Sequence, residues 1–339
     1  MRKFLSFVMC AVLTAALIIS QTGCGEKTEK VEKTSYYMDT ICTITVYDMD
    51  DMSEEAAGKA IDAAFALCAE YESLISATVE GSDIYRINHA GGESVECDPR
   101  TVDLLQTALD YGKKSDGKFD VTVGKLTDLW DFHAEDPQVP SAAAVKEALS
   151  TVDYEKVDIS GNTVTMKDPK AHINLGGIGK GYVGDRAAEC LQEQGVTSAV
   201  INFGGNIIAV GDKAGAVFEI GIQKPFAEQE YLGVVGVKDA SVVTSGIYER
   251  GFEKDGKYYH HILDVKTGWP VENDVVSVTL VGGLGHSADC DAMATICLML
   301  GVEDGIAYVE SVDGMEALFV DSDGNITKTS GMDDYLEDR

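Results

Sequence analysis

An aspartate and a threonine one helical turn apart have the residue types and spacing of a metal site. Ser287 to Thr295 predicts the start of a helix, in which Asp291 and Thr295 lie four residues apart on one face. A carboxylate and a hydroxyl supply the oxygen ligands that a hard cation such as Mg²⁺ takes. The alternative is structural: Ser287 and Asp289 cap the helix, and Thr295 faces the core.

A glycine-rich segment stands before a second predicted helix. Gly179, Gly181 and Gly184 have the spacing of a dinucleotide fingerprint, in which glycines let a phosphate approach backbone N–H groups at a helix start. That fold requires an acidic residue at the end of the next strand, and this strand ends with Asn202-Phe203. Because Lys180 is followed by another glycine, the segment is not a Walker loop either. A tight glycine turn without a ligand is the alternative.

Titratable side chains are dense just before a Gly-x-Pro turn at residues 268–270. His260 and His261 stand there with an aspartate, a threonine and Lys266, a set that suits a general base or a phosphate contact. Neighbouring side chains of a strand point to opposite faces, so only one histidine can face a site. Each histidine has a plain alternative role as a surface or core polar group.

The elements that position these residues follow from apolar periodicity. Apolar residues three and four apart predict amphipathic helices at 53–75 and 98–112, and further helices are predicted at 182–191, 287–300 and 303–312. Short β-branched and apolar runs predict strands at 41–47, 163–166, 199–203, 217–222, 232–237, 276–281 and 318–320. Strands and helices do not alternate strictly, which predicts an α+β fold with largely antiparallel sheets and packed helices.

The N-terminus predicts export. Arg2 and Lys3 precede an apolar run that is too short to span a bilayer, which is the layout of a secretory signal peptide over residues 1–23. Cys24 then resembles the lipidated cysteine of bacterial lipoproteins, with an ordinary cleaved signal as the alternative. The rest divides into a lipidated N-terminus and flexible tether at 24–35, a folded domain at 36–332 and an acidic tail at 333–339.

Charge and cysteine content narrow the class of protein. A formal net charge of −30 without a basic patch argues against nucleic-acid binding. The six cysteines after Cys24 permit disulfides in an exported chain. Three of them lie in apolar helix patterns and no CxxC motif occurs, so we expect mostly buried free thiols.

In order and spacing, these motifs resemble the ApbE family of FAD:protein FMN transferases. The resemblance runs from Met38-Asp-Thr40 to Asp291-Ala-Met-Ala-Thr295 and covers nearly all of the folded domain. The segments between them that carry it are 82–88, 119–130, 174–185, 202–206, 245–250 and 261–268. The resemblance implies a two-lobed, T-fold-related α+β architecture.

The resemblance also implies a site beside bound FAD. The residues expected at the cofactor are Met38, Thr78, Phe119, Asp120, Val121, Thr122, Asn174, Lys180 and Lys266. One or two Mg²⁺ ions are expected on Asp291, Thr295 and the backbone oxygen of Gly177. Under this reading, the glycine segment is a turn at the flavin site.

Three residues depart from the family pattern. Asp39 replaces a usual glycine and Asn174 a usual aspartate, and both changes are expected to reduce or reshape FAD affinity. Thr78 stands where transferases commonly carry a tyrosine against the cofactor. Members that differ there include ones that hydrolyse FAD to FMN and AMP.

The implied reaction is Mg²⁺-dependent transfer of the FMN half of FAD to a threonine of an acceptor flavoprotein, with release of AMP. We expect His261 to be the general base, with His260 as its substitute, because a hydroxyl has a high pKa. The implied acceptor is an exported subunit of a respiratory or ion-pumping redox complex, and the protein would be lipid-anchored on the outer side of the cell membrane. An FAD pyrophosphatase and a non-catalytic FAD-binding lipoprotein are the alternatives.

Overall fold

The computed structural model describes residues 30–47 and 52–337. Its centre is an eight-stranded sheet in which every neighbouring pair of strands is antiparallel. In spatial order its strands are β1 (Val31–Tyr37), β2 (Thr40–Val46), β6 (Ala199–Phe203), β7 (Asn206–Val210), β10 (Ala240–Gly246), β13 (Val275–Gly283), β14 (Glu316–Asp321) and β15 (Ile326–Lys328). The signal peptide, Cys24 and the first part of the expected tether lie outside the described residues.

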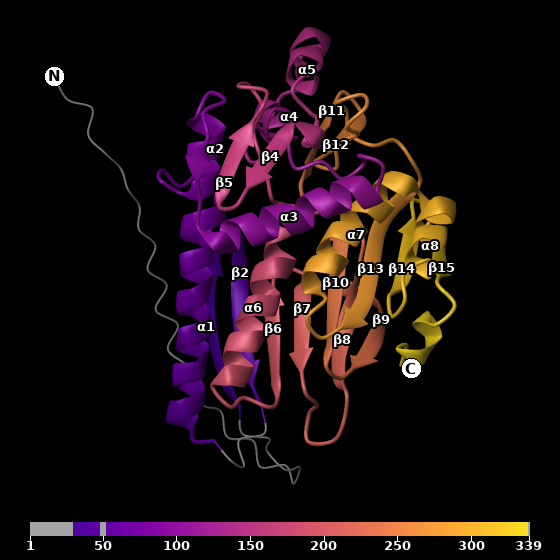
Figure 1. Cartoon of the computed structure of the whole chain (residues 1–339). Coiled ribbons are helices and arrows are strands. Elements are labelled where there is room, and N and C mark those ends of the chain that lie inside the picture. The colour runs from indigo at the N-terminus through magenta and orange to yellow at the C-terminus, as the bar shows by residue number, and fades with distance from the viewer. Residues whose placement is uncertain (1–29, 48–51, 338–339) are drawn as a thin grey trace, which may run out of the picture.

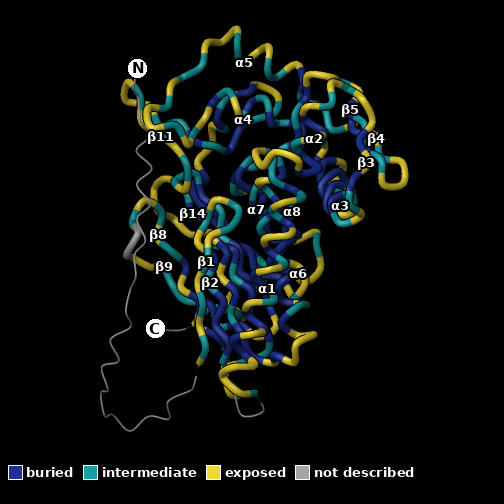
Figure 2. Tube along the Cα trace, turned by 90° about the vertical axis from the view of Figure 1, so that its left-hand side faces the viewer, coloured by how far each residue is buried: buried dark blue, intermediate teal, exposed yellow. Residues whose placement is uncertain are grey.

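Helices cover one face of this sheet and a β-hairpin covers part of the other (Figure 1). The helices are α1 (Glu54–Ile75), α6 (Gly179–Glu193), α7 (Ser287–Leu300) and α8 (Val302–Glu310). The hairpin is β8 (Phe218–Lys224) with β9 (Ala227–Val237). The largest hydrophobic core fills the space between helices and sheet, and a second core lies between sheet and hairpin (Figure 2).

A smaller group of elements sits across the upper end of the sheet in Figure 1. It contains α2 (Asp83–His89), α3 (Pro99–Lys114), α4 (Gly124–Trp130), α5 (Ala142–Leu149), the sheet β3 (Val95–Glu96), β5 (Thr163–Met166) and β4 (Val157–Ser160), and the hairpin β11 (Gly251–Lys254) and β12 (Lys257–His260). Part of this group has its own core around Leu126 and Trp130, whose indole Nε1 donates to the carbonyl of Gly268 at 3.0 Å. Two 3₁₀ turns, Tyr154–Lys156 and Met332–Asp334, complete the described elements.

The predicted α+β class with mainly antiparallel sheets is confirmed, and so are the five predicted helices and seven predicted strands. Two predictions were wrong. The helix expected from Tyr182 begins at Gly179, so the glycine segment is the start of α6 and not a turn. The tether was expected to be flexible to residue 35, but β1 occupies Val31–Tyr37 and pairs with β2.

The cysteines are in the predicted state, and the C-terminal residues pack on the fold. The six cysteines of the described part are free thiols, five of them buried, as expected. The first residues of the acidic tail pack against β9, where Gly236 N donates to Tyr335 O and Glu337 N donates to Val234 O. Among the described helices, none combines the length and apolarity needed to cross a membrane.

Candidate active site

The starts of α6 and α7 meet in close contact. A Cβ placed on Gly181 would lie 2.2 Å from the carbonyl oxygen of Ser287, so only glycine allows this approach. The backbone N–H of Gly181 donates to Oδ2 of Asp291 at 2.9 Å. Asp291 is therefore a buried carboxylate fixed between two helix N-termini, where the helix dipoles favour negative charge.

The three expected metal ligands lie together. A Cβ on Gly177 would lie 3.3 Å from Oγ1 of Thr295 and 3.1 Å from the ring of Phe119. Thr295 is one turn after Asp291 and its hydroxyl donates to the Asp291 backbone oxygen at 3.4 Å. A carboxylate, a hydroxyl and a loop backbone thus converge beside an aromatic ring.

The structural alternative for this helix start does not hold as stated. No side chain of α7 caps its own N-terminus: the N–H groups of Ser287 and Ala288 donate instead to Asp185 of α6, at 3.0 and 2.9 Å. Asp289 accepts from Tyr111 at 2.5 Å and contacts His286 at 2.7 Å. Thr295 is only partly buried, so it is not a core residue.

Glu249 lies near the Asp291 carboxylate and near two cationic residues, Lys180 and Arg250. Burial raises the pKa of Glu249, the positive charge of Lys180 opposes that rise, and the negative charge of Asp291 adds to it. Arg250 follows directly, and its backbone oxygen accepts from the backbone N–H of His261 at 3.1 Å. The predicted lysine and histidine therefore lie in the same neighbourhood as the expected metal ligands.

His261 has the tautomer that a general base needs. Its Nδ1 lies 3.1 Å from the carbonyl oxygen of Arg250, so Nδ1 carries the proton and the lone pair is on Nε2. Burial lowers the pKa of His261 to about 3, and the charges of Arg250 and Lys180 act in the same direction. The imidazole is neutral at pH 7, and the negative charge of a phosphate bound nearby would raise its pKa towards the range of an effective base.

His260 is placed differently. It ends β12 and is buried, with Nε2 donating to the carbonyl oxygen of Val271 at 3.1 Å. Its Nδ1 has no partner among the described residues. The two histidines thus have separate surroundings, and His261 is the one beside Lys180 and Arg250.

The predicted cofactor residues of the loop 119–122 divide into two kinds. Phe119 lies against Gly177 at the site. The side chain of Asp120 is instead bonded within the protein, to Thr122 N and Oγ1 at 2.7 and 2.6 Å and to Tyr154 N at 2.9 Å. Thr122 also accepts from Asp153 N. Asp120 and Thr122 therefore hold the shape of the loop.

Asn174 connects this loop to the glycine segment. Its backbone N–H donates to the carbonyl of Val121 at 2.7 Å, its side-chain oxygen accepts from Gly176 N at 2.8 Å, and its amide donates to Thr127. The amide thus does two structural tasks: it fixes the turn before Gly177 and joins it to α4.

The remaining predicted cofactor residues lie on the surface or in a turn. Met38 and Asp39 form the two-residue turn between β1 and β2, both with positive φ, and Met38 N donates to Glu72 of α1 at 2.7 Å. Thr78 and Lys266 are exposed. Within the described residues, no hydrogen bond or ion pair joins either of them to Asp291 or Thr295.

Sequence reasoning missed three charged residues around the site, Asp185, Glu249 and Arg250, and the buried Asn206 of β7. Asn206 is fully buried, and neither atom of its amide has a partner in the described chain. It lies on the same face of β7 as Ile208, which packs on Gly184 of α6. The family segments 202–206 and 245–250 contained Asn206, Glu249 and Arg250 but gave them no role.

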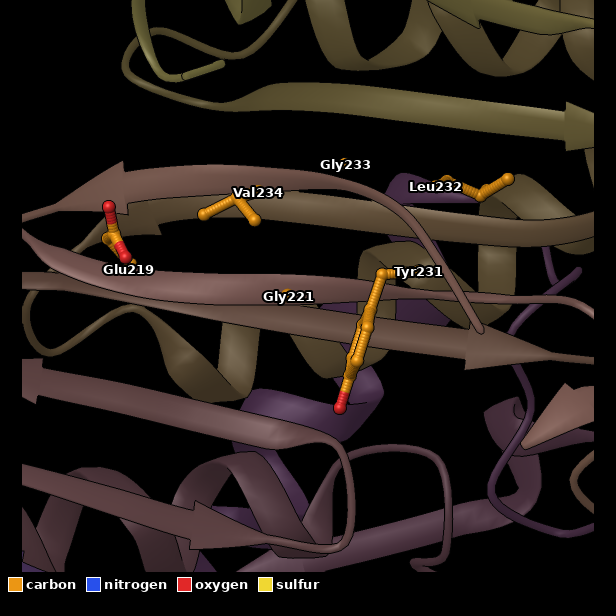
Figure 3. Close-up of a pocket in the computed structure, with 6 residues that line it drawn as sticks. All are labelled: Glu219, Gly221, Tyr231, Leu232, Gly233 and Val234. Atoms are coloured by element: carbon orange, nitrogen blue, oxygen red, sulfur yellow. The ribbon is translucent and has the colours of Figure 1, made fainter. Parts of the chain in front are cut away.

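Two surface hollows lie away from this cluster. One, of about 440 Å³, is on the outer hairpin of β8 and β9 and is lined by Glu219, Gly221, Tyr231, Leu232, Gly233 and Val234 (Figure 3). The other, of about 310 Å³, lies between α3 and the 3₁₀ turn that starts at Tyr154. Neither hollow includes a predicted site residue.

Known proteins of one family resemble this chain over most of its length. The model of the ApbE family matches residues 38–319. An FAD:protein FMN transferase of Treponema pallidum is 33% identical over 336 residues, covering 94% of this chain and 92% of the relative, and one of Klebsiella pneumoniae is 36% identical over 270 residues, covering 78% and 83%. The crystal structure of the ApbE protein of Thermotoga maritima superposes with a TM-score of 0.82 at 30% identity, covering 91% of this chain and all of that one. The flavin transferase ApbE of Vibrio cholerae gives a TM-score of 0.79 at 27% identity, with the same coverage. This chain belongs to the ApbE family.

Proposed function

We propose that this chain transfers the FMN half of FAD to a threonine of an acceptor protein, with Mg²⁺ as cofactor and AMP as the second product. As a member of its family it is an enzyme of the FAD:protein FMN transferase type, by similarity over most of its length to relatives with that name. The observation that carries the detailed proposal is the convergence of Gly177, Asp291 and Thr295 beside Lys180 and His261.

The residues at this point fit a magnesium ion. In the described chain, no group of three or more His, Cys, Asp or Glu side chains could hold a metal. Mg²⁺ does not require one, because it commonly takes one or two carboxylates and completes its shell with water and substrate phosphates. Asp291, the Thr295 hydroxyl and the Gly177 carbonyl supply three oxygens, and the missing Cβ of Gly177 leaves room beside them. When bound, the ion would neutralise charge on the FAD pyrophosphate.

The chain's own residues then perform the transfer. Lys180, at the start of α6, would attract the pyrophosphate together with the helix N-terminus. His261 Nε2 would accept the proton of the threonine hydroxyl, whose oxygen forms a bond to the FMN phosphorus while the phosphorus–oxygen bond to AMP breaks. Phosphoryl transfer of this kind depends mainly on positioning and on charge stabilisation.

The test measures both products with purified full-length chain. FAD, Mg²⁺ and an exported flavoprotein subunit of a redox complex are incubated together, the acceptor is analysed by mass spectrometry for bound FMN, and AMP is quantified. Asp291→Ala should lose both products, while Asp289→Asn, which changes a carboxylate in the same helix that bonds Tyr111, should retain them. Full activity of folded Asp291→Ala at low Mg²⁺ would contradict the assignment.

A second candidate function is hydrolysis of FAD to FMN and AMP. The observation in its favour is Thr78, which is small and exposed where related transferases commonly have a tyrosine. We expect slow hydrolysis as a side reaction and Thr78→Tyr to suppress it. His261→Ala should abolish transfer, since loss of a general base costs about 10²- to 10⁴-fold in rate, while FAD binding persists. Free FMN as the sole flavin product of the wild type with acceptor present would establish the pyrophosphatase.

The proposed location is the outer side of the cell membrane, with a lipid anchor on Cys24. The signal-like N-terminus supports this proposal. Cys24→Ser should move the protein from the membrane fraction to the soluble exported fraction. Unchanged retention in membranes would remove the lipid anchor from the proposal.

A further inference from the structure

Two carboxylates join α6 and α7 in a reciprocal way. Asp291 of α7 accepts from Gly181 N in the first turn of α6 at 2.9 Å. Asp185 of α6 accepts from Ser287 N and Ala288 N in the first turn of α7, at 3.0 and 2.9 Å. Each helix therefore supplies the N-terminal cap of the other, and all of these groups are buried.

This reciprocal pair fixes the position of Asp291. Both oxygens of Asp185 are used on α7, so the first turn of α7 cannot shift along or rotate about its axis without breaking a charge-assisted hydrogen bond. The close contact at Gly181, where a Cβ would overlap the Ser287 carbonyl, leaves the helices no room to move closer together, and the three hydrogen bonds oppose their separation. Asp291 lies one turn later on the same helix, with one carboxylate oxygen on Gly181.

We propose that Asp185 is a positioning residue, which orients Asp291 so that its second carboxylate oxygen faces the Gly177 and Thr295 oxygens as a metal ligand. This inference rests on the Mg²⁺ site of the proposed function. Asp185 does not contact the metal or the substrate in this arrangement. It acts through α7 and Asp291, as residues that hold a metal ligand in orientation do in other metal sites.

The expected effect is confined to the Mg²⁺-dependent part of ligand binding. ADP contains the pyrophosphate and adenosine of FAD and cannot donate FMN, so its binding reports the site without turnover. In the wild type, Mg²⁺ should tighten ADP binding. At the Mg²⁺ concentration that saturates the wild type, Asp185→Ala should weaken ADP binding by about 10- to 100-fold. This is the usual cost of losing a residue that supports a metal ligand. Binding of ADP without Mg²⁺ should not change.

Two further variants distinguish positioning from general stability. Asp185→Asn keeps one oxygen acceptor and should give an intermediate loss. Asp98→Ala removes the carboxylate cap of α3, where Asp98 accepts from Arg100 N, and should lower thermal stability without changing the Mg²⁺ dependence. Calorimetric titrations are made at a temperature where circular dichroism shows every variant to be folded.

Each result decides a different point. A folded Asp185→Ala that keeps Mg²⁺-dependent ADP binding within twofold of the wild type overturns the positioning role and leaves the proposed function standing. Equal losses with and without Mg²⁺ also overturn it, because they indicate a general loss of site structure. A wild type whose ADP binding ignores Mg²⁺ overturns the metal assignment itself, and the inference fails with it.

Discussion

The buried histidine at the end of β12 makes a quantitative prediction about acid stability. His260 donates through Nε2 to the Val271 carbonyl, and its Nδ1 has no partner in the described chain. Protonation would place a charge and a second N–H in a buried position without an acceptor. Burial accordingly lowers the pKa of His260 to about 4.

The direction of the pH effect follows from linkage. The folded pKa lies below the unfolded value, so the unfolded state binds the proton first as the pH falls. The contribution of neutral His260 to stability is therefore complete above about pH 6.5 and declines below it. With a folded pKa of about 4, the free energy of unfolding should fall by about 2 kcal/mol between pH 7 and pH 5, and by about 3 kcal/mol at pH 4.

The assay compares wild type with His260→Gln, since glutamine keeps an N–H donor for Val271 and does not titrate. Urea denaturation at pH 7, 6 and 5 gives the free energy of unfolding of each protein, and the difference between them cancels the other titrating groups. We expect this difference to change by about 2 kcal/mol in favour of the variant from pH 7 to pH 5. His133→Gln, which replaces an exposed histidine, is the control. A difference that stays constant within about 0.5 kcal/mol would refute the reasoning.

Four more substitutions test local geometry by thermal denaturation. Asp39→Gly should raise the free energy of unfolding by about 0.5 kcal/mol. Asp39 has a φ of 57°, which glycine adopts without strain, and this gain exceeds the extra backbone entropy that glycine loses on folding. A lower melting temperature would contradict this. Gly181→Ala should cost about 3 kcal/mol or more, whereas Gly179→Ala, whose Cβ would find its nearest neighbour at 3.8 Å, should be tolerated; equal effects of the two would exclude the close contact as the cause. Trp130→Phe should cost about 1 to 3 kcal/mol through the lost bond to Gly268, and an unchanged melting temperature would count against that bond.

Sequence patterns predicted those elements whose residues interact mainly with a single large core. The helix predicted over 287–300 has the bounds of α7, whose mostly buried side chains pack on the sheet and on neighbouring helices. The strand β1 was missed because the four consecutive charged and polar residues at 32–35 interrupt any apolar alternation. Its ordering comes from β2 and from α1, where Lys33 donates to Gly58 O at 2.8 Å and to Asp62 at 2.6 Å. Such contacts between distant residues leave no periodic trace.

The site could likewise be predicted only where its residues share one helix. Asp291 and Thr295 lie on one helix face, so their spacing was sufficient to pair them. Asp185 and Glu249 reach the same place from a different helix and from the loop after β10. The bond between Gly181 and Asp291 joins residues 110 positions apart, and no local pattern specifies a partner at that distance.

The glycine segment at 179–184 was predicted to be a turn, whereas the structure has the start of helix α6 there. Glycine is a poor helix former, so three glycines in six residues indicate a turn. In α6 two of them instead meet a close neighbour: a Cβ on Gly181 would overlap the Ser287 carbonyl, and one on Gly184 would lie 2.7 Å from Ile208. A Cβ on Gly179 would make only an ordinary contact, at 3.8 Å. The dinucleotide fingerprint uses glycine for the same physical reason, close approach to a backbone, but the approaching group there is a phosphate. The glycine spacing therefore predicts that another group approaches the backbone closely, but only the fold shows which group it is. At Gly181 it is the first turn of α7, the helix that carries the proposed metal ligand Asp291 one turn later.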